Sequence, residues 1–363
     1  MASSPAGSNL TVSAALIAVI LATMGALYTA DVFLARLEQR EVSAEARRRF
    51  DSGQAQLRDS RLAEAVESFQ HAHSLDREDE QYQLALADAQ IRKGDWDAAE
   101  RNVQEMLDAD SNAGEANLLM ARILAAKGDF EAAESYFRRA IYGNWPPGAD
   151  RNRTDARLEL VNLLSRSGDS KTLLAELLPL EDASSADPRI ARQLPALFLK
   201  AGSLQRAEAS YRALISRNPH DAEAHAGLAR VELEKGNYRG ARAAFAEAAH
   251  LRPDDSSYSA GEKLAADAAD LDPTSRELSS AEKFLRSTKI LAIARDAVLS
   301  CANERTANLL NSSDKLLASK PPKSFSNEIA EQRLDLAQEL WRAIPTSCEK
   351  PELLATIMQK LSQ

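Results

Sequence analysis

The sequence has little of what several other classes of protein need. Aromatic residues make up 5% of the 363 positions, and no alternation of β-branched with polar residues continues for more than a few positions. Both features argue against a fold built on strands. Leucine, alanine, glutamate and arginine, which favour helices, dominate instead. The sequence therefore predicts an all-α protein.

Clustered positive charge and catalytic motifs are also missing. The formal net charge is −9 and the isoelectric point is near 5.3, which argues against nucleic-acid binding. There is no phosphate-binding or dinucleotide-binding glycine pattern, no H-E-x-x-H and no G-x-S-x-G. The five histidines have no metal-ligand spacing, and His71 and His73 would point in different directions on a helix. We expect no catalytic, cofactor or metal site, and no enzyme activity.

Cysteine is scarce, with only Cys301 and Cys348 present. Two interpretations are open. The two residues are buried free thiols, or they form a disulfide that ties the C-terminal region closed. The disulfide would require an oxidising compartment.

A short phrase, by contrast, returns at a fixed interval. It reads GDWDAA and GDFEAA in its two clearest copies, and the intervals are 34, 34, 40, 34 and 34 residues. The six copies begin at Ser60, Gly94, Gly128, Gly168, Gly202 and Gly236. A constant interval of this length predicts a solenoid of stacked units and not one globular core.

Each copy lies between two segments with apolar residues at helical spacing. The glycine suits the left-handed residue after a helix end, and the following Asp or Asn can cap the next helix. Small and large residues occur at fixed offsets from it. A small residue lies five positions later at Ala65, Ala99, Ala133, Ala207 and Ala241, and seven earlier at Gly53, Ala87, Ala121 and Ala229. An apolar residue lies nine positions later at Phe69, Val103, Phe137, Leu177, Tyr211 and Phe245.

These offsets resemble those of the tetratricopeptide repeat (TPR) family, in which two small residues and a closing proline hold fixed places. Pro219 and Pro253 close the fifth and sixth copies. The resemblance extends over residues 46–255. It implies a solenoid of about six repeats, each made of a helix, a tight turn and an antiparallel helix.

Three departures from the pattern carry expectations. The fourth copy has Leu173 and Val161 at the small sites, and the fifth has Pro195, which predicts a kink or a late helix start. Between the third and fourth copies the period lengthens by six residues, at residues 142–150. Trp145 in this insertion either packs onto helix ends or contacts a partner.

The N-terminal part has an apolar run. Residues 1–9 are small and polar, and we expect them to be disordered. Residues 10–30 contain no charge, and at about 1.5 Å per residue a helix of this length spans roughly 31 Å, close to the thickness of a bilayer core. We expect a retained transmembrane helix, followed by a helical linker over residues 31–45. A cleaved signal peptide and a buried soluble helix are the alternatives.

The side of the membrane on which the repeats lie depends on opposing signals. No Lys or Arg precedes the run, whereas five arginines follow it within about twenty residues, which places the repeats in the cytoplasm of a cell whose inner membrane holds the span. A disulfide between the cysteines would instead place them in the periplasm. Residues 256–363 lack the phrase but keep helical spacing, and we expect a helical C-terminal cap there.

The remaining candidate site is the groove formed by the first helix of each repeat, where proteins of this family bind an extended peptide or a helix. Positions two before each turn residue carry several cations, and residues four earlier would share their face. The candidate groove residues are Arg58, Arg92, Arg122, Asn162, Arg166, Lys200 and Arg230. The cations either complement helix dipoles or bind an acidic ligand.

The layout resembles single-span bacterial TPR proteins that assist the assembly of envelope or membrane complexes. We therefore expect a membrane-anchored scaffold whose partner is another protein. A holdase-like chaperone, which would need an apolar groove, and a non-catalytic subunit of an enzyme complex are the alternatives.

Overall fold

The computed structural model describes residues 8–300, 306–345 and 348–362 and, in the first helix, the side chains of residue 21 and residues 23–58. This part of the chain contains seventeen α-helices and no strand, which confirms the all-α prediction. It divides into two compact units, Met1–Leu163 and Leu164–Gln363. Residues 1–7, most of the segment expected to be disordered, lie outside the described residues.

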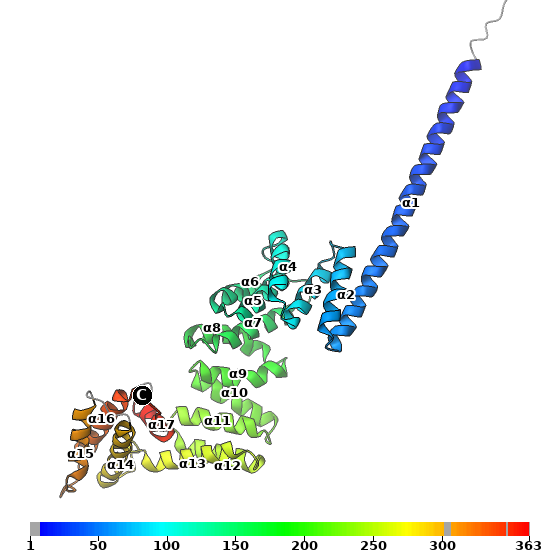
Figure 1. Ribbon diagram of the computed structural model, residues 1–363. Helices are drawn as coiled ribbons and strands as arrows, with labels where there is room; N and C mark the ends of the chain where they lie inside the picture. Colours follow the sequence, from blue (N-terminus) through cyan, green and yellow to red (C-terminus); the bar gives the residue numbers. More distant parts are fainter. Residues whose placement is uncertain (1–7, 301–305, 346–347, 363) are drawn as a thin grey trace, which may run out of the picture. The chain divides into compact units, whose positions relative to one another are not determined.

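Unit 1 holds one long helix and the first repeats. Its helices are α1 (Ser8–Arg58), α2 (Leu62–Leu75), α3 (Glu80–Lys93), α4 (Trp96–Ala109), α5 (Gly114–Lys127), α6 (Phe130–Tyr142) and α7 (Asp150–Leu164) (Figure 1). The end of α1 packs on α2, α3 on α4, and α5 on α6, each pair joined by a tight turn.

Unit 2 holds the later repeats and the C-terminal region. Its helices are α8 (Ser170–Ala183), α9 (Pro188–Lys200), α10 (Leu204–Arg217), α11 (Ala222–Glu234), α12 (Tyr238–Leu251), α13 (Ser256–Leu271), α14 (Ser280–Leu299), α15 (Ala307–Ala318), α16 (Asn327–Ala343) and α17 (Glu352–Leu361). Here α9 pairs with α10 and α11 with α12, and α13 extends the stack by packing on α12.

The turn residues of the phrase have the left-handed backbone that the sequence predicts. The φ angles are 69 to 87° at the five glycines and 60° at Ser60. At Gly94, two backbone N–H groups close the turn: Gly94 N donates to Ile91 O at 3.0 Å, and Asp95 N donates to Gln90 O at 2.9 Å. These bonds satisfy carbonyls that the end of the helix would otherwise leave open.

The predicted caps form in three of the turns. Asp129, Asp169 and Asn237 each accept a hydrogen bond from a backbone N–H in the first turn of the next helix. Asp95 makes no such bond, and its carboxylate instead lies 2.7 Å from Lys93 Nζ. A capped helix start therefore recurs through both units, as local capping preferences lead us to expect.

The fixed offsets correspond to buried contacts between the paired helices. The five alanines that follow the turns by five positions are all 0% exposed. The apolar residues nine positions after the turns are buried too. Phe69 lies so close to Gly53 that a Cβ at Gly53 would be 2.7 Å from the ring atom Cε1. The small sites are thus the points where helix backbones and large side chains meet most closely.

The irregular copies are accommodated without loss of burial. Leu173 and Val161 are both buried, at 2% and 0% exposure. Helix α9 begins at Pro188, fourteen residues before Gly202, and continues through Pro195. Helix α3 also begins fourteen residues before its turn glycine, so of the two alternatives for the fifth copy, a kink or a late helix start, the late start is wrong. Pro195 supplies no N–H, and α9 forgoes one backbone hydrogen bond there.

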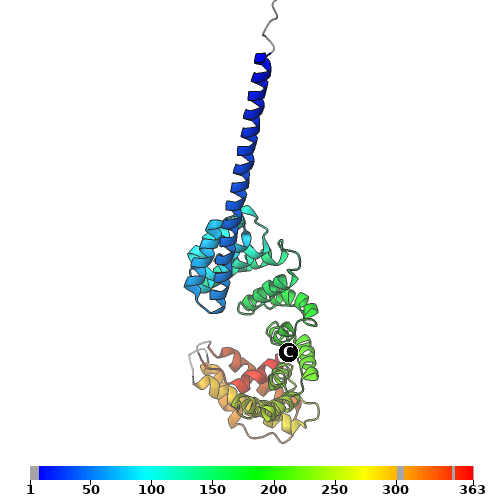
Figure 2. The ribbon, with the colours of Figure 1, turned by 90° about the vertical axis from the view of Figure 1, so that its right-hand side faces the viewer.

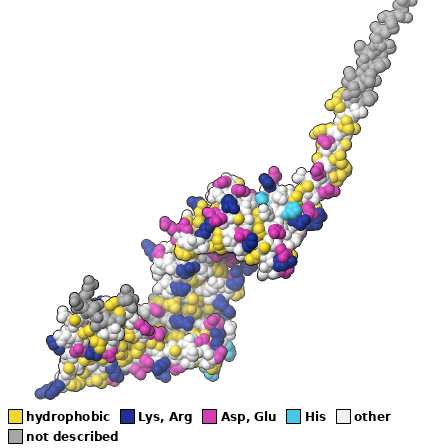
Figure 3. Space-filling view, in the orientation of Figure 1, with side chains coloured by type: hydrophobic (Ala, Val, Ile, Leu, Met, Phe, Trp, Pro, Cys, Tyr) yellow, Lys and Arg dark blue, Asp and Glu magenta, His cyan; other side chains and the backbone are white. Residues whose placement is uncertain are grey.

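Helix α1 runs without interruption from Ser8 through the linker segment into the first repeat, and only its C-terminal part packs on α2 (Figures 1 and 2). Before that part, most of its described apolar side chains are exposed, including Leu21 at 64%, Leu27 at 71% and Phe33 at 61% (Figure 3). Among the described residues, no helix contains an apolar segment long enough to cross a membrane. The side chains of residues 10–20 and 22, most of the expected span, lie outside the described set, and the span stays a prediction.

Helices α14 to α17 meet in a hydrophobic core at the end of the repeats. Its fully buried members include Ile290, Leu291, Leu340 and Leu354, and α12 contributes Tyr238 to the same cluster. The C-terminal region therefore covers the last helices of the solenoid with apolar side chains, which a stacked repeat array requires at its ends.

Candidate functional site

The face made by the first helices of the repeats in unit 1 contains a pocket of about 370 Å³. Helices α3, α5 and α7 supply its walls together with the insertion after α6. The lining residues are Leu84, Ala85, Asp88, Glu115, Leu118, Leu119, Arg122, Trp145, Asn152 and Asp155. We call this cavity the unit 1 pocket. It combines an apolar floor with several charged side chains.

Trp145 is held in the wall of this pocket by the insertion. Its indole Nε1 donates to Ala140 O at 2.7 Å, and its ring lies so close to Gly114 that a Cβ there would be 2.3 Å from Nε1. Two backbone bonds of 2.7 Å fix the neighbouring residue: Asn144 N donates to Asn112 O, and Gly114 N donates to Asn144 O. Trp145 therefore packs onto a helix start, as one of the two interpretations predicts, and still borders the pocket.

Arg122 and Arg92 of the candidate groove cations each contact a carboxylate of the chain. Arg122 makes a two-pronged contact with Glu159 of α7, with nitrogen–oxygen distances of 2.9 and 2.6 Å. Arg92 lies 2.8 Å from Asp88, one turn earlier on α3. The contact with Glu159 raises the pKa of Arg122 although burial acts in the opposite direction. Both guanidinium groups thus have a carboxylate partner before any ligand arrives.

The other candidates do not gather at one place. Arg58 is exposed at the end of α1, and Asn162 lies in the last turn of α7. In unit 2, Arg166 and Lys200 are exposed at or just beyond helix ends, where they suit the helix dipole. Arg230 is exposed on α11. Of the seven predicted groove residues, only Arg122 lines the unit 1 pocket and only Arg230 lines the pocket described next.

Unit 2 has its own pocket of about 610 Å³ on the first-helix face, and the C-terminal helix α17 forms one wall. Its lining residues are Leu199, Arg230, Leu233, Glu234, Phe245, Ser257, Ala260, Gly261, Leu264, Glu352, Ala355, Thr356 and Gln359. The sequence did not identify the α17 residues, since helical spacing shows that α17 is amphipathic but not where it docks. The chain itself therefore fills part of this face.

Polar contacts fasten α17 to the turn between α11 and α12. Lys360 Nζ donates to Gly236 O at 3.0 Å and lies 2.6 Å from the Asp272 carboxylate. Tyr238 Oη donates to Thr356 O at 3.0 Å. Burial and the Asp272 charge raise the pKa of Tyr238. The phenol therefore keeps its proton and stays a donor.

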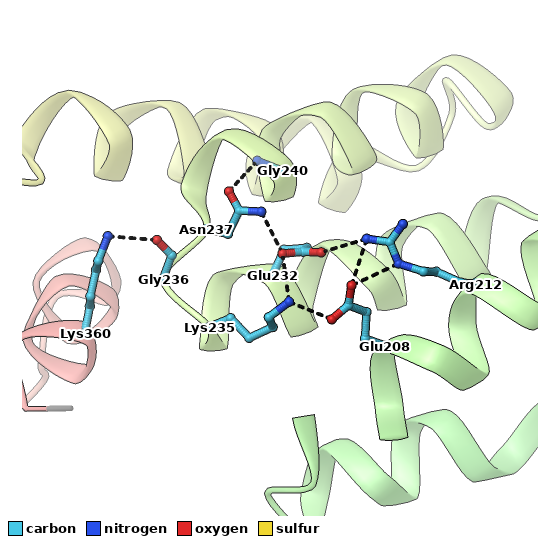
Figure 4. A network of polar contacts seen from close by, with 8 residues as sticks. All are labelled: Glu208, Arg212, Glu232, Lys235, Gly236, Asn237, Gly240 and Lys360. Atoms are coloured by element: carbon cyan, nitrogen blue, oxygen red, sulfur yellow. Dashed lines mark hydrogen bonds and ion pairs between the residues drawn. The ribbon is translucent and has the colours of Figure 1, made fainter. Parts of the chain in front are cut away.

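The same turn is braced from the other side by a network of charges (Figure 4). The carboxylate of Glu232, 4% exposed, accepts from Asn237 Nδ2 at 2.8 Å and lies 3.5 Å from Arg212. Lys235 Nζ lies 2.6 Å from Glu208, and this hydrogen bond lowers the pKa of Glu208. The contacts join α10 to α11 and fix the loop that α17 contacts.

Of the two cysteines, only Cys348 lies among the described residues. Cys348 packs, partly buried, against the core of α14 to α17. Cys301 lies outside the described residues, and the disulfide stays a prediction. Within the described residues, no group of three or more His, Cys, Asp or Glu side chains is arranged to hold a metal ion.

Comparisons with known proteins identify the repeats. Residues 84–149 and 198–266 each match a family model described as a tetratricopeptide repeat. The chain is similar to cellulose synthase 1 operon protein C of Komagataeibacter xylinus, with 25% identity over 191 residues. That match covers 53% of this chain and only 12% of the relative.

Two solved structures are also similar. YrrB, described as a TPR protein with an unusual peptide-binding site, has a TM-score of 0.47 and 19% identity, over 55% of this chain and 99% of that one. A tetratricopeptide repeat protein from Parabacteroides merdae has a TM-score of 0.43 and 15% identity, over 81% of this chain and 99% of that one.

Proposed function

This chain is a tetratricopeptide repeat protein, and from that premise we propose that it is a membrane-anchored scaffold that binds a segment of another protein. The observation that carries the proposal is the pair of pockets on the first-helix face, one in each unit. Their lining mixes apolar and charged side chains, which suits recognition of a polypeptide. We propose no catalytic role for the chain.

The anchor is supported by α1. From Leu21 to Asp31 every described side chain is exposed, although most of them are apolar. Exposed apolar side chains all around a helix favour a lipid environment over water. The uncharged residues 10–30 have the length of a bilayer crossing. The proposed location is the inner membrane, with the repeats in the cytoplasm because of the arginines after the run, or in the periplasm if the cysteines pair.

The biological setting proposed is assembly of a membrane or envelope complex. The relative that this chain matches over 12% of its length is named for a cellulose synthase operon, and the proposal extends that link to an enzyme complex only by analogy. A role as a non-catalytic subunit of an enzyme complex is the alternative proposal, in which helices α14 to α17, which share a hydrophobic core, would contact the catalytic subunit. An acidic ligand stays a proposal for Arg166, Lys200 and Arg230, whose side chains are exposed in unit 2.

Fractionation of cells tests the anchor. Full-length protein should stay in the membrane pellet after a carbonate wash, and deletion of residues 1–35 should release it. Chemical crosslinking in intact cells, followed by capture from solubilised membranes, should recover the same partner protein repeatedly. A mature N-terminus beyond Ala30, or a soluble full-length protein, would end the anchoring proposal.

A test of the acidic ligand needs only the captured partner. Replacing Arg166 and Lys200 by glutamate should weaken its binding while helicity and melting stay unchanged. Unaltered affinity would mean that these side chains only complement helix dipoles.

A further inference from the structure

The six-residue insertion between the third and fourth copies gives unit 1 a feature that the regular repeats lack. It places Trp145 at the rim of the unit 1 pocket and locks it there through the Nε1 bond to Ala140 O. An indole fixed by a hydrogen bond and by contact with Gly114 presents a rigid apolar surface. Side chains of α5 and α7 form the rest of the pocket wall.

The charged side chains of this pocket are mostly acidic. Three carboxylates line it, from Asp88, Glu115 and Asp155, against the single guanidinium of Arg122. That guanidinium is already held by Glu159 on two sides, so little of its charge remains for a ligand. The Arg92 side chain that pairs with Asp88 is 56% exposed and therefore well screened by water. The lining thus carries three carboxylates and one guanidinium, whereas most of the groove residues that the sequence suggested are cations.

The pKa of the Glu115 carboxyl group is raised in the folded chain. Burial raises its pKa, and the nearby charge of Glu80 raises it further. Both effects disfavour the carboxylate form of Glu115 in the empty pocket. A cation placed beside Glu115 would favour the carboxylate form by its charge, so binding of a positive group should lower the pKa of Glu115.

The apolar floor beside these carboxylates defines the shape of the group. Leu84, Leu118 and Leu119 lie in the same cavity as Glu115 and Trp145. Long basic side chains have this character, since an aliphatic stem packs on apolar surface while its charged end reaches a carboxylate. A small inorganic cation would leave the floor uncovered.

We propose that the unit 1 pocket binds a lysine or arginine side chain of an extended partner segment. The stem would pack against Leu118 and Trp145, and the charged end would bind Glu115 and Asp155. This inference rests on the proposed scaffold function and names the chemistry of one of its partners. A second copy of the chain, a membrane surface or an acidic segment would be alternative occupants, and the experiment below separates them.

Fluorine NMR on the full chain in non-ionic detergent tests the proposal directly. The chain has three tryptophans, and fluorotryptophan labelling gives one signal for each, with Trp145 assigned from the Trp145→Phe variant. The probe is the peptide acetyl-Ala-Ala-Leu-Arg-Leu-Ala-Ala-amide. The control is the same peptide with glutamate in place of arginine. We expect the arginine peptide to shift the Trp145 signal and to leave those of Trp96 and Trp341 unchanged.

The double variant Glu115→Gln, Asp155→Asn should weaken this binding by about tenfold or more, because both carboxylates that meet the cation are gone. A matched control with the same change in charge, Glu131→Gln with Asp108→Asn, lies outside the pocket lining and should leave it unaltered. Because the pKa of Glu115 is raised on folding, Glu115→Gln should be at least as stable as the natural chain at neutral pH. Thermal unfolding of the double variant, followed by circular dichroism, should match that of the natural chain, so that lost binding is not due to unfolding.

Three outcomes would overturn the inference. They are no shift of the Trp145 signal at millimolar arginine peptide, equal or stronger binding of the glutamate peptide, or equal binding by the double variant. A concentration-dependent shift without peptide would indicate a second copy as the occupant, and one produced by anionic vesicles alone would indicate a membrane. If the double variant still captures the crosslinked partner, the scaffold function stands and only the chemistry of this pocket is wrong.

Discussion

Ser60 adopts the left-handed conformation that glycine occupies in every later copy of the turn. Its φ angle of 60° brings Cβ toward its own carbonyl, at a cost of about 1–2 kcal/mol relative to glycine. We therefore expect Ser60→Gly to raise the free energy of unfolding of the first repeat by about 0.5–1 kcal/mol, once the greater freedom of glycine in the unfolded chain is subtracted. Urea denaturation followed by circular dichroism measures this.

The reverse change supplies the matched control. At Gly94 a Cβ would meet nothing within 4 Å, so Gly94→Ser adds only the conformational cost of its φ angle of 87°. It should lower the free energy of unfolding by about 0.5–1 kcal/mol, because the strain is again partly offset by the lower freedom of serine in the unfolded chain. If the two changes had the same sign, backbone conformation would not be what selects glycine at these turns.

The contact between Asp272 and Lys360 should make stability depend on pH. Burial acts to raise the pKa of Asp272, but hydrogen bonds from Lys360 and Thr274 outweigh it and hold the pKa below its ordinary value. A lowered carboxyl pKa means that the contact stabilises the fold above the pKa of the unfolded chain. That contribution is lost as the pH falls through the pKa of the folded state.

We expect Asp272→Asn to lower the free energy of unfolding by about 2 kcal/mol at neutral pH, and this difference should shrink as the pH falls below about 4, the ordinary pKa of an aspartate. Asp51→Asn is the control, since Asp51 and Arg47 are 56% and 60% exposed and their pairing should matter little at any pH. A difference that stayed constant between pH 7 and 3 would show that the carboxylate charge of Asp272 is not what matters.

Helix α17 has only ten residues but anchors the C-terminal region. Its Leu354, Ile357 and Met358 are buried in the C-terminal core, and its polar residues fasten it to the turn at Gly236. Deletion of residues 350–363 should therefore increase amide hydrogen exchange throughout α11 to α16. Helices α3 to α6 should keep their protection, because repeat units depend mainly on their neighbours. Unchanged exchange in α14 and α16 would mean that α17 is dispensable.

Local features of the helices could be predicted from the sequence, whereas contacts between distant residues could not. The turn at Gly94 and the burial of Ala99 follow from positions a few residues apart, because glycine conformation and helix pairing act locally. The groove was predicted less well. Arg122 has its charge taken by Glu159, 37 residues away, and no spacing rule links the two.

The same limit applies to the partners that complete each pocket. Trp145 could be singled out as unusual because its insertion breaks a constant period, but its position beside Glu115 depends on how three repeats stack. The docking of Thr356 at Tyr238 joins residues 118 positions apart. A period identifies the architecture of a solenoid, and it carries no information about what folds back onto it.

For the whole molecule, the two cysteines and the charges beside the apolar run make opposing predictions about its location. The five arginines after residue 30 resist translocation and favour a cytoplasmic repeat region. A bond between Cys301 and Cys348 would favour the exported side. It would close a loop of about 47 residues and stabilise the fold by roughly 4 kcal/mol in the chain-entropy model.

Thiol labelling of acid-trapped, denatured protein separates the two possibilities. If the repeats are cytoplasmic, both cysteines should react before any reductant is added. If labelling appears only after reduction, together with the matching change in intact mass, the cytoplasmic location is wrong and the periplasmic one replaces it.

The continuity of α1 has a consequence for where a partner can be met. No break interrupts the helix between Ala30 and Ala46, so sixteen residues at 1.5 Å each make a stiff stalk of about 24 Å between the proposed span and the first repeat. With a flexible tether, the distance between the repeats and the bilayer would vary widely. A stiff helix instead keeps the unit 1 pocket within a narrow range of distances from the bilayer. A partner rooted in the same membrane would then search in two dimensions, and its basic segment would have to reach that height. A membrane protein whose basic segment does not extend about 24 Å from the bilayer would not reach the pocket and would not bind.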